Sequence, residues 1–387
     1  MSFHAHSYVA DHLQYIAVIV PVALIVASLT VAFRRYGFGI WPPRIAAGIV
    51  LFLLAALSWQ RAKAFENDMT IWMDTVQKNP DAWVAHSNLG ALYRKQEKLD
   101  LALDHYRTLL RINPNNVIAH NSVGSLYRMK GQAAEAGQHY HLAIKIDPDF
   151  ADAHYNLGLL NQQQNNLESA VDHYLEAIAR RPDHVDAHNN LGVILRKIDK
   201  LDEALHHLRE AQRLAPNHAV IRNNLGNALR QIGQVAEAIT EYREALRLQP
   251  EYAEAHFSMA QTLAKAGETD RAIVHYRQAI RLKPQWPHPM NSLAWLLVHD
   301  SGLAQHQPEE AIQLAQRAVA LTRKQHPPML RTLAEAYAAA GKFELAVQAA
   351  EAALALFSGQ AENPLTKELR EQIENYKQGK TVQGVKE

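Results

Sequence analysis

Residues 151–184 read ADAHYNLGLLNQQQNNLESAVDHYLEAIARRPDH, and this stretch predicts the fold of most of the chain. Small or apolar residues recur in it at helical spacing, in two blocks. The first block holds Leu157, Gly158 and Asn161, and the second holds Ala170, Tyr174 and Ala177. This pattern predicts two amphipathic helices joined by a polar turn. Pro182 is expected to end the second helix, because proline cannot donate the next backbone hydrogen bond and restricts the residue before it.

The same pattern recurs along the chain at a fixed interval. Seven prolines follow one another at steps of 34 residues: Pro80, Pro114, Pro148, Pro182, Pro216, Pro250 and Pro284. A period held for so long predicts an array of repeats, each of which covers only its neighbours.

Small residues recur at two positions of each repeat, counted from Trp83 as position 1. Position 8 is occupied by Gly90, Gly124, Gly158, Gly192, Gly226, Ala260, Ala294 and Ala334. Position 20 is occupied by Ala102, Ala136, Ala170, Ala204, Ala238, Ala272, Ala311 and Ala346. Such residues allow two helices to approach at the short end of the range of about 8 to 10 Å. A larger residue, mostly tyrosine, recurs at position 24.

These residues resemble the tetratricopeptide repeat (TPR), in which Leu-Gly, Tyr, Ala, Ala and Pro occur at such spacings. The resemblance covers about residues 64–378 and implies an all-α fold, an α-solenoid in which helix hairpins form a right-handed superhelix. A half repeat is expected at 64–82, eight repeats at 83–358, and a capping helix and tail at 359–387. Repeat seven is five residues longer between its helices than the others.

Asparagine recurs at position 6, on the side of the first helix that faces away from its partner. The residues at this position are Asn88, Ser122, Asn156, Asn190, Asn224, Ser258 and Ser292. The resemblance implies that this side lines a concave groove, and the row is similar to the asparagine ladder of O-linked N-acetylglucosamine transferase. An amide both donates and accepts hydrogen bonds, which suits an extended peptide backbone. The alternative is that asparagine is only a tolerated polar residue there.

Arginine recurs at position 12 of the first five repeats. Arg94, Arg128, Arg196 and Arg230 occupy it, with Gln162 in repeat three. Four guanidinium groups on one face would bind carboxylates or phosphates. The alternative is that each arginine only stabilises the C-terminal end of its helix.

Histidine at position 4 is interpreted as structural. His86, His120, His154, His188 and His256 are a full repeat apart, too far to share a metal ion at ligand distances of about 2 Å. No metal site is expected from them.

Two apolar runs precede the repeats and are expected to be transmembrane helices. Residues 13–33 carry no charge and are long enough to cross the hydrocarbon layer of about 30 Å. The second run, about 45–60, is shorter and bracketed by Trp41 and Trp59. Its alternative is a buried or interfacial helix. The expected fold class is therefore all-α, with two N-terminal transmembrane helices followed by the TPR solenoid, and residues 13–60 are expected to contact membrane lipid.

Charges near these runs predict an orientation. Arg34, Arg35 and Arg44 lie between the two runs, whereas Arg61 and Lys63 follow the second. The positive-inside rule then places the short loop in the cytoplasm and the repeats outside it, in a periplasm or lumen. The protein is thus expected to be an integral membrane protein.

Composition and motifs exclude several classes of function. The chain has 387 residues, with 40 Lys and Arg against 39 Asp and Glu, so its formal charge is +1 and general attraction to nucleic acid is not expected. The absence of cysteine excludes disulfides and thiolate chemistry. No phosphate-binding, zinc-protease or nucleophile-elbow motif occurs. We therefore expect no catalytic residue, no cofactor, and no enzyme activity.

Three functions compete on this evidence. The leading one is a membrane-anchored scaffold that binds peptide segments or partner proteins in the groove. The second is the non-catalytic C-terminal part of a membrane glycosyltransferase, because residues 8–90 resemble the corresponding junction in transmembrane TPR O-mannosyltransferases, whose repeats recognise protein substrate. The third, a cytosolic O-linked N-acetylglucosamine transferase, matches only the repeats.

Overall fold

The computed structural model describes residues 67–299, 307–357 and 363–381, together with scattered positions between 24 and 52. The chain divides into two compact units, Met1–Ile146 and Asp147–Glu387.

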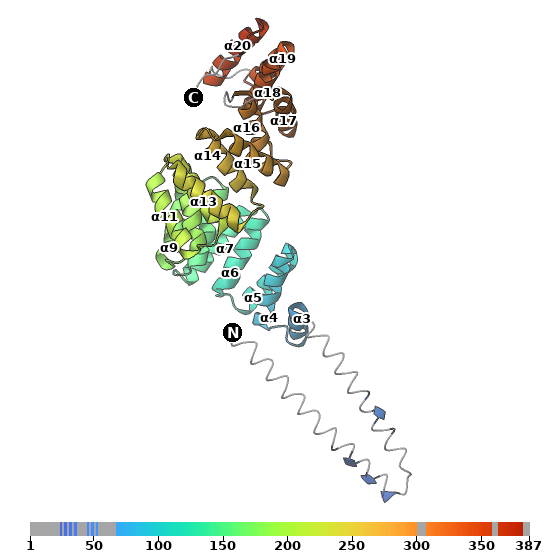
Figure 1. The fold of residues 1–387 in the computed structure, drawn as a ribbon. Helices are drawn as coiled ribbons and strands as arrows, with labels where there is room; N and C mark the ends of the chain where they lie inside the picture. The colour runs from blue at the N-terminus through green and yellow to red at the C-terminus, as the bar shows by residue number, and fades with distance from the viewer. Residues whose placement is uncertain are drawn as a thin grey trace. The chain divides into compact units, whose positions relative to one another are not determined.

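The described regular structure of both units is helical (Figure 1). The first unit contains α3 (Asp68–Lys78), α4 (Trp83–Lys95), α5 (Leu99–Ile112), α6 (Val117–Met129) and α7 (Ala133–Ile146). The second contains α8 (Ala151–Gln163), α9 (Leu167–Arg180), α10 (Val185–Lys197), α11 (Leu201–Leu214), α12 (Ala219–Gln231), α13 (Val235–Leu248), α14 (Ala253–Lys265), α15 (Thr269–Leu282), α16 (Pro287–His299), α17 (Pro308–Leu321), α18 (Pro327–Ala339), α19 (Phe343–Ala355) and α20 (Pro364–Lys377).

From α4 onward, successive helices pack as hairpins, α4 with α5 through α18 with α19. The turn inside most hairpins contains one residue with a left-handed backbone, at position 15 of the repeat. This residue is Glu97, Gly131, Asn165, Asp199, Gly233, Gly267 or Gly341, with φ between 59° and 83°. A left-handed residue ends the first helix and reverses the chain, and only glycine adopts it without steric cost.

Glycine at position 8 lets the two helices of a hairpin touch. A Cβ atom added to Gly158 would lie 2.6 Å from the ring of Tyr174, and one added to Gly192 would lie 2.6 Å from Leu208 Cγ. Tyr174 and Leu208 are themselves fully buried. The structure therefore confirms the close approach predicted from the small residues, and it shows that the side chain at position 24 fills the space the glycine leaves.

Helix ends follow the local sequence. Each proline of the 34-residue period lies just beyond the end of a second helix. Pro182, for example, follows α9, which ends at Arg180. Three late helices, α17, α18 and α20, begin with proline, which suits the first helical position because no backbone N–H is needed there. Asn67 and Asn363 cap α3 and α20 with reciprocal bonds to Thr70 and Thr366.

The membrane part of the predicted fold class is corrected by the structure. Throughout the part of the chain that the structure describes, no helix combines the length and apolarity needed to cross a membrane. The helices from α3 to α20 have 11 to 14 residues, so the longest spans about 21 Å, short of the hydrocarbon layer of about 30 Å. The prediction of two transmembrane helices, which rested on the length and lack of charge of the first run and on the tryptophans that flank the second, is contradicted by this finding. So is the predicted integral membrane location with extracytoplasmic repeats. Most residues of the runs 13–33 and 45–60 lie outside the described residues.

Candidate functional site

Two asparagines at position 6 of the second unit, Asn190 and Asn224, belong to a chain of amides that crosses repeats. Asn224 Nδ2 on α12 donates to Asn189 Oδ1 on α10 at 2.9 Å, and Asn189 Nδ2 donates to Asn190 Oδ1 at 3.1 Å. Asn190 Nδ2 then donates to the hydroxyl of Tyr155 on α8 at 3.1 Å. Asn156, at the equivalent position of α8, is partly buried. The structure thus brings Asn190 and Asn224 together through Asn189, which the sequence analysis did not single out.

The first unit places its predicted residues differently. Asn88 Nδ2 donates to the carbonyl of Val84 in its own helix at 2.8 Å. Asn88 and Arg94 line a pocket of about 570 Å³ with Trp72 of α3. Arg128 is partly buried, and its Nε has no hydrogen-bond partner among the described residues. Only Asn88 and Arg94 of the predicted residues in this unit therefore line one hollow.

Arg196 and Arg230 form a pair of like charges in the second unit. Both are partly buried, and the Nε of each is buried without a hydrogen-bond partner in the described part of the chain. Arg196 Nη1 donates to Gln231 Oε1 at 3.4 Å, a long bond to a neutral acceptor. Burial, and then the charge of Arg230, lower the pKa of Arg196. Two guanidinium groups that repel one another in a partly desolvated place would be stabilised by an anion.

A pocket near the C-terminal end of the second unit was not predicted. We call it the C-terminal pocket; its volume is about 490 Å³. It is lined by Ala264, Tyr276, Asn291, Ser292, Trp295, Leu296, His299, Pro328, Arg331, Thr332, Glu335, Glu368 and Gln372. In α16 and α18 the lining residues fall mainly at positions 2, 5, 6 and 9 of the repeat, on the side predicted to face the groove.

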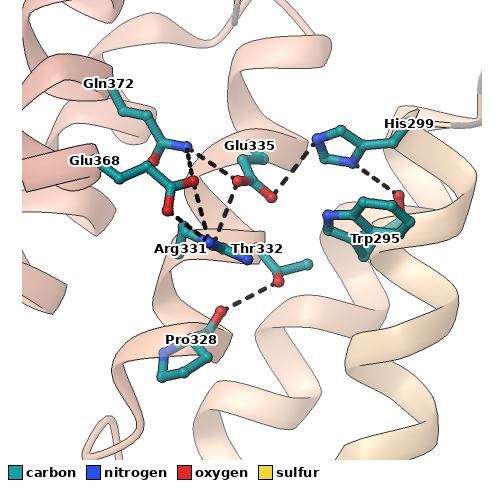
Figure 2. A network of polar contacts seen from close by, with 8 residues as sticks. All are labelled: Trp295, His299, Pro328, Arg331, Thr332, Glu335, Glu368 and Gln372. Carbon is teal, nitrogen blue, oxygen red and sulfur yellow. Dashed lines mark hydrogen bonds and ion pairs between the residues drawn. The ribbon is translucent and has the colours of Figure 1, made fainter. Parts of the chain in front are cut away.

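Polar contacts connect α16, α18 and α20 around the C-terminal pocket (Figure 2). Arg331 Nη1 donates to both carboxylate oxygens of Glu368, at 3.1 and 2.9 Å. Gln372 Nε2 donates to Glu335 Oε1 at 3.1 Å. Glu335 is only 7% exposed, and burial raises the pKa of its carboxyl group. Burial also raises the pKa of Tyr276 to about 12.

One feature of the sequence signals this pocket. Position 9 of the repeats is small, apolar or neutral everywhere except in repeat eight, where it is Glu335. A carboxylate at this position faces the groove and can contact a ligand there, whereas a carboxylate on the outer side of a second helix faces solvent. Glu335 is not among the site residues predicted from the sequence.

The histidines at position 4 are structural, and their partners reveal how. His188 Nε2 lies 3.1 Å from the carbonyl oxygen of Pro182, and its Nδ1 lies 3.0 Å from Nδ1 of His207 at position 23. The carbonyl can only accept, so Nε2 of His188 carries the proton and its Nδ1 accepts from His207. The same pair occurs in three other hairpins: His86 with His105, His120 with His139, and His256 with His275.

Repeat five replaces the histidine pair by an ion pair at the same two positions. Arg222 Nε donates to the carbonyl of Pro216 at 3.0 Å, as the histidines do in other repeats. Arg222 Nη1 lies 2.9 Å from Glu241 Oε2, and both side chains are 17% exposed. In repeats one to six, position 4 therefore holds a donor to the proline carbonyl, and this donor need not be a histidine. Over the described residues, no group of three or more His, Asp or Glu side chains could hold a metal ion.

Hairpins of 13- and 14-residue helices, stacked with small residues at their contacts, define an α-solenoid of helical repeats. Family models of the tetratricopeptide repeat match residues 83–116, 124–165, 155–219, 226–267, 253–286 and 300–361. Together these matches cover more than half of the chain, and the chain belongs to the tetratricopeptide repeat family. The matches describe the repeat and give no support to the predicted relationship with membrane glycosyltransferases.

Solved structures with the same fold are distantly related in sequence. PilF of Pseudomonas aeruginosa is 21% identical, with 56% of this chain and 98% of that chain covered and a TM-score of 0.51. The Cut9-Hcn1 hetero-tetramer of the APC/C is 17% identical, with 69% and 52% covered and a TM-score of 0.56. YrrB, described as a TPR protein with an unusual peptide-binding site, is 21% identical, with 48% and 96% covered and a TM-score of 0.42. No significant match is found among curated protein sequences. The likenesses to PilF and to the Cut9-Hcn1 complex show the fold alone.

Proposed function

We propose that this TPR protein is a scaffold that binds an extended peptide segment of a partner protein on the groove side of its first helices. The pair Arg196 and Arg230 carries the proposal. In it, residues 83–358 supply the repeats, and the segments at 64–82 and 359–387 cover their two ends.

The arginine pair supports an acidic ligand group. Arg213 and Arg247, on the second helices α11 and α13, each contact a glutamate of their own helix, at 2.9 and 2.8 Å. Arg196 and Arg230 have no ion pair with any described residue, although both are more buried. A partly buried cation is stable when an anion pairs with it. A carboxylate or phosphate of the ligand would supply that partner and would end the repulsion between the two guanidinium groups.

The amide chain supports an extended backbone beside that group. A side-chain amide has two N–H donors and a carbonyl oxygen with two lone pairs. In the chain Asn224 to Asn189 to Asn190, each amide uses only part of this capacity. The neighbouring bonds fix the orientation of Asn190 and Asn224, so the remaining donors and acceptors are held in place for peptide groups. Such contacts tolerate many sequences, because every residue has a backbone N–H and C=O. Asn156 would extend this surface within the second unit, and Asn88, Arg94 and Arg128 would contribute to a separate surface of the first unit.

A random peptide library displayed on phage tests the proposal with the full-length protein. We expect the selected peptides to be rich in Asp and Glu, and the double variant Arg196→Gln/Arg230→Gln to bind them about tenfold or more weakly, which corresponds to about 1.4 kcal/mol. The matched control is Arg213→Gln/Arg247→Gln, which also removes two arginines one repeat apart. Equal binding by the two double variants would contradict the proposal.

A further inference from the structure

The C-terminal pocket presents acceptors that lack donors. Glu335 Oε2, Gln372 Oε1 and Asn291 Oδ1 are buried atoms with no hydrogen-bond partner in the described part of the chain. Glu335 is 7% exposed and Gln372 is 3% exposed, and all three side chains line the pocket. Buried acceptors without partners lose the free energy of hydration without compensation. Three of them around one cavity define a place for a ligand with several donors.

His299 adds a fourth acceptor. Its Nδ1 lies 2.9 Å from the carbonyl oxygen of Trp295, and a carbonyl only accepts, so Nδ1 carries a proton. In the neutral ring Nε2 is then an acceptor. That atom faces Glu335 Oε2 at 3.8 Å. Two acceptors therefore face one another at a distance too long for a hydrogen bond, and a donor placed between them would satisfy both.

The charges around the pocket leave one carboxylate in excess. Arg331 is the cation beside the two carboxylates of the network, and it is bonded to both oxygens of Glu368. Its Nε lies 3.5 Å from Glu335 Oε1, on the side away from the oxygen that lacks a partner. In the state with a neutral His299 ring, Glu335 and Glu368 outweigh Arg331 by one negative charge. The ligand that balances this charge is a cation.

An aromatic surface forms another part of the wall. The ring of Trp295 stacks on the ring of His299 at 4.6 Å between centroids and 13° between planes. Trp295 is 40% exposed although it lines the cavity. An indole attracts a cation and allows a planar guanidinium group to stack on it. A planar cation with five N–H donors thus fits the acceptors and the aromatic wall together.

We infer that the C-terminal pocket binds the guanidinium group of an arginine side chain of a partner polypeptide, with Glu335 Oε2 as its charged acceptor and Trp295 as its stacking surface. The inference relies on the proposed function only for the source of the arginine. It adds a subsite for a basic side chain to the subsite for an acidic group at Arg196 and Arg230. The two subsites together specify which peptides the second unit selects.

The probe that tests the inference is N-acetyl-L-argininamide, observed on full-length protein labelled with 5-fluorotryptophan. The variant Trp295→Phe assigns the fluorine resonance of Trp295 among the six tryptophans. We expect the probe to shift that resonance in a saturable manner. N-acetyl-L-citrullinamide has nearly the same shape without the charge, and we expect no saturable shift from it.

Glu335→Gln is the decisive variant. It keeps the size of the side chain, and because a buried amide costs less than a buried carboxylate, we expect the fold to be retained. Binding of N-acetyl-L-argininamide should fall at least about tenfold. Asn291→Ala is expected to weaken binding as well, and by less. The matched control is Glu351→Gln, an exposed glutamate on α19, which should bind as the parent protein does.

Two results would overturn the inference: equal shifts of Trp295 by the arginine and citrulline probes, or unchanged binding in Glu335→Gln with its circular dichroism intact. Either result leaves the proposed function standing if Arg196→Gln/Arg230→Gln still weakens the binding of acidic peptides. Loss of acidic peptide selection with the argininamide shift intact would instead refute the proposed function alone.

Discussion

Nδ1 of His188 accepts a hydrogen bond from Nδ1 of His207 across the hairpin of α10 and α11, at 3.0 Å. The bond requires a neutral His188, since a protonated His188 would present a donor to a donor. Burial, and then the nearby His188, lower the pKa of His207 from 6.5 to about 4. The pKa of His275, in the pair of α14 and α15, is lowered to about 4 by burial and by His256.

These pairs predict that stability falls in acid. The folded pKa is below the unfolded value, so the unfolded chain binds more protons between the two values. The stabilisation is complete above a pH of about 6.5 and is lost as the pH falls from there toward about 4, at about 1 to 3 kcal/mol per buried ring. Urea denaturation at several pH values measures this loss.

The ion pair of repeat five supplies the matched variant. His188→Arg/His207→Glu places the pair of Arg222 and Glu241 in the hairpin of α10 and α11. We expect hydrogen exchange in that hairpin to become less sensitive to pH between 7 and 5, while the hairpin of His256 and His275 keeps its sensitivity. A stability that does not change over this pH range in the parent protein would refute the lowered pKa values of His207 and His275.

Gly192→Leu is expected to disrupt one hairpin. A Cβ atom at Gly192 would lie 2.6 Å from Leu208 Cγ and 3.0 Å from the carbonyl oxygen of Ala204. The second contact is with backbone, which cannot rotate away, so α10 and α11 must separate. We expect a loss of about 2 to 4 kcal/mol in the free energy of unfolding, measured in urea. Val193→Leu, one residue along and partly exposed, should change stability by less than about 0.5 kcal/mol.

Glu97→Gly is expected to stabilise the protein. Glu97 has φ of 59° in the turn between α4 and α5, where other repeats carry glycine. A side chain in the left-handed region costs about 1 kcal/mol or more. We therefore expect the free energy of unfolding of this hairpin to rise by about 0.5 to 1 kcal/mol. The reverse change Gly131→Ala, at the same position of the next repeat, should lower it. A loss of stability in Glu97→Gly would show that the strain is relieved elsewhere in the turn.

Binding at the C-terminal pocket should strengthen as the pH rises. Burial raises the pKa of Glu335, while His299, Arg331 and Gln372 act in the opposite direction and Glu368 adds to the rise. Protonation of Glu335 removes the excess negative charge and converts an acceptor into a donor. We expect the dissociation constant of N-acetyl-L-argininamide to increase from pH 8 to pH 5, and this dependence to be smaller in Glu335→Gln. Tighter binding in acid would indicate a different charged acceptor.

The 34-residue period and the recurring small residues predicted the hairpins well. The two helices of a hairpin are adjacent in sequence, so contact residues such as Gly192 can be recognised within one repeat. Pairing between side chains was harder to predict. His188 and His207 are 19 residues apart, and only the packing of two helices brings them together. The C-terminal pocket requires residues from α16, α18 and α20, and no spacing within one repeat indicates that Glu335 will meet Gln372. The apolar runs before residue 60 predicted transmembrane helices from hydropathy. Among the described residues, no helix is long and apolar enough to cross a membrane, which contradicts that prediction.

The exchange of a histidine pair for Arg222 and Glu241 makes one hairpin of the second unit chemically unlike its neighbours. A guanidinium group keeps its charge throughout the acid range, so α12 and α13 hold together under conditions that loosen the imidazole-paired hairpins on either side. In acid, the hairpin that carries Arg230 would then stay folded after the hairpin that carries Arg196 has loosened. The proposed anion site would lose one of its two arginines before the other.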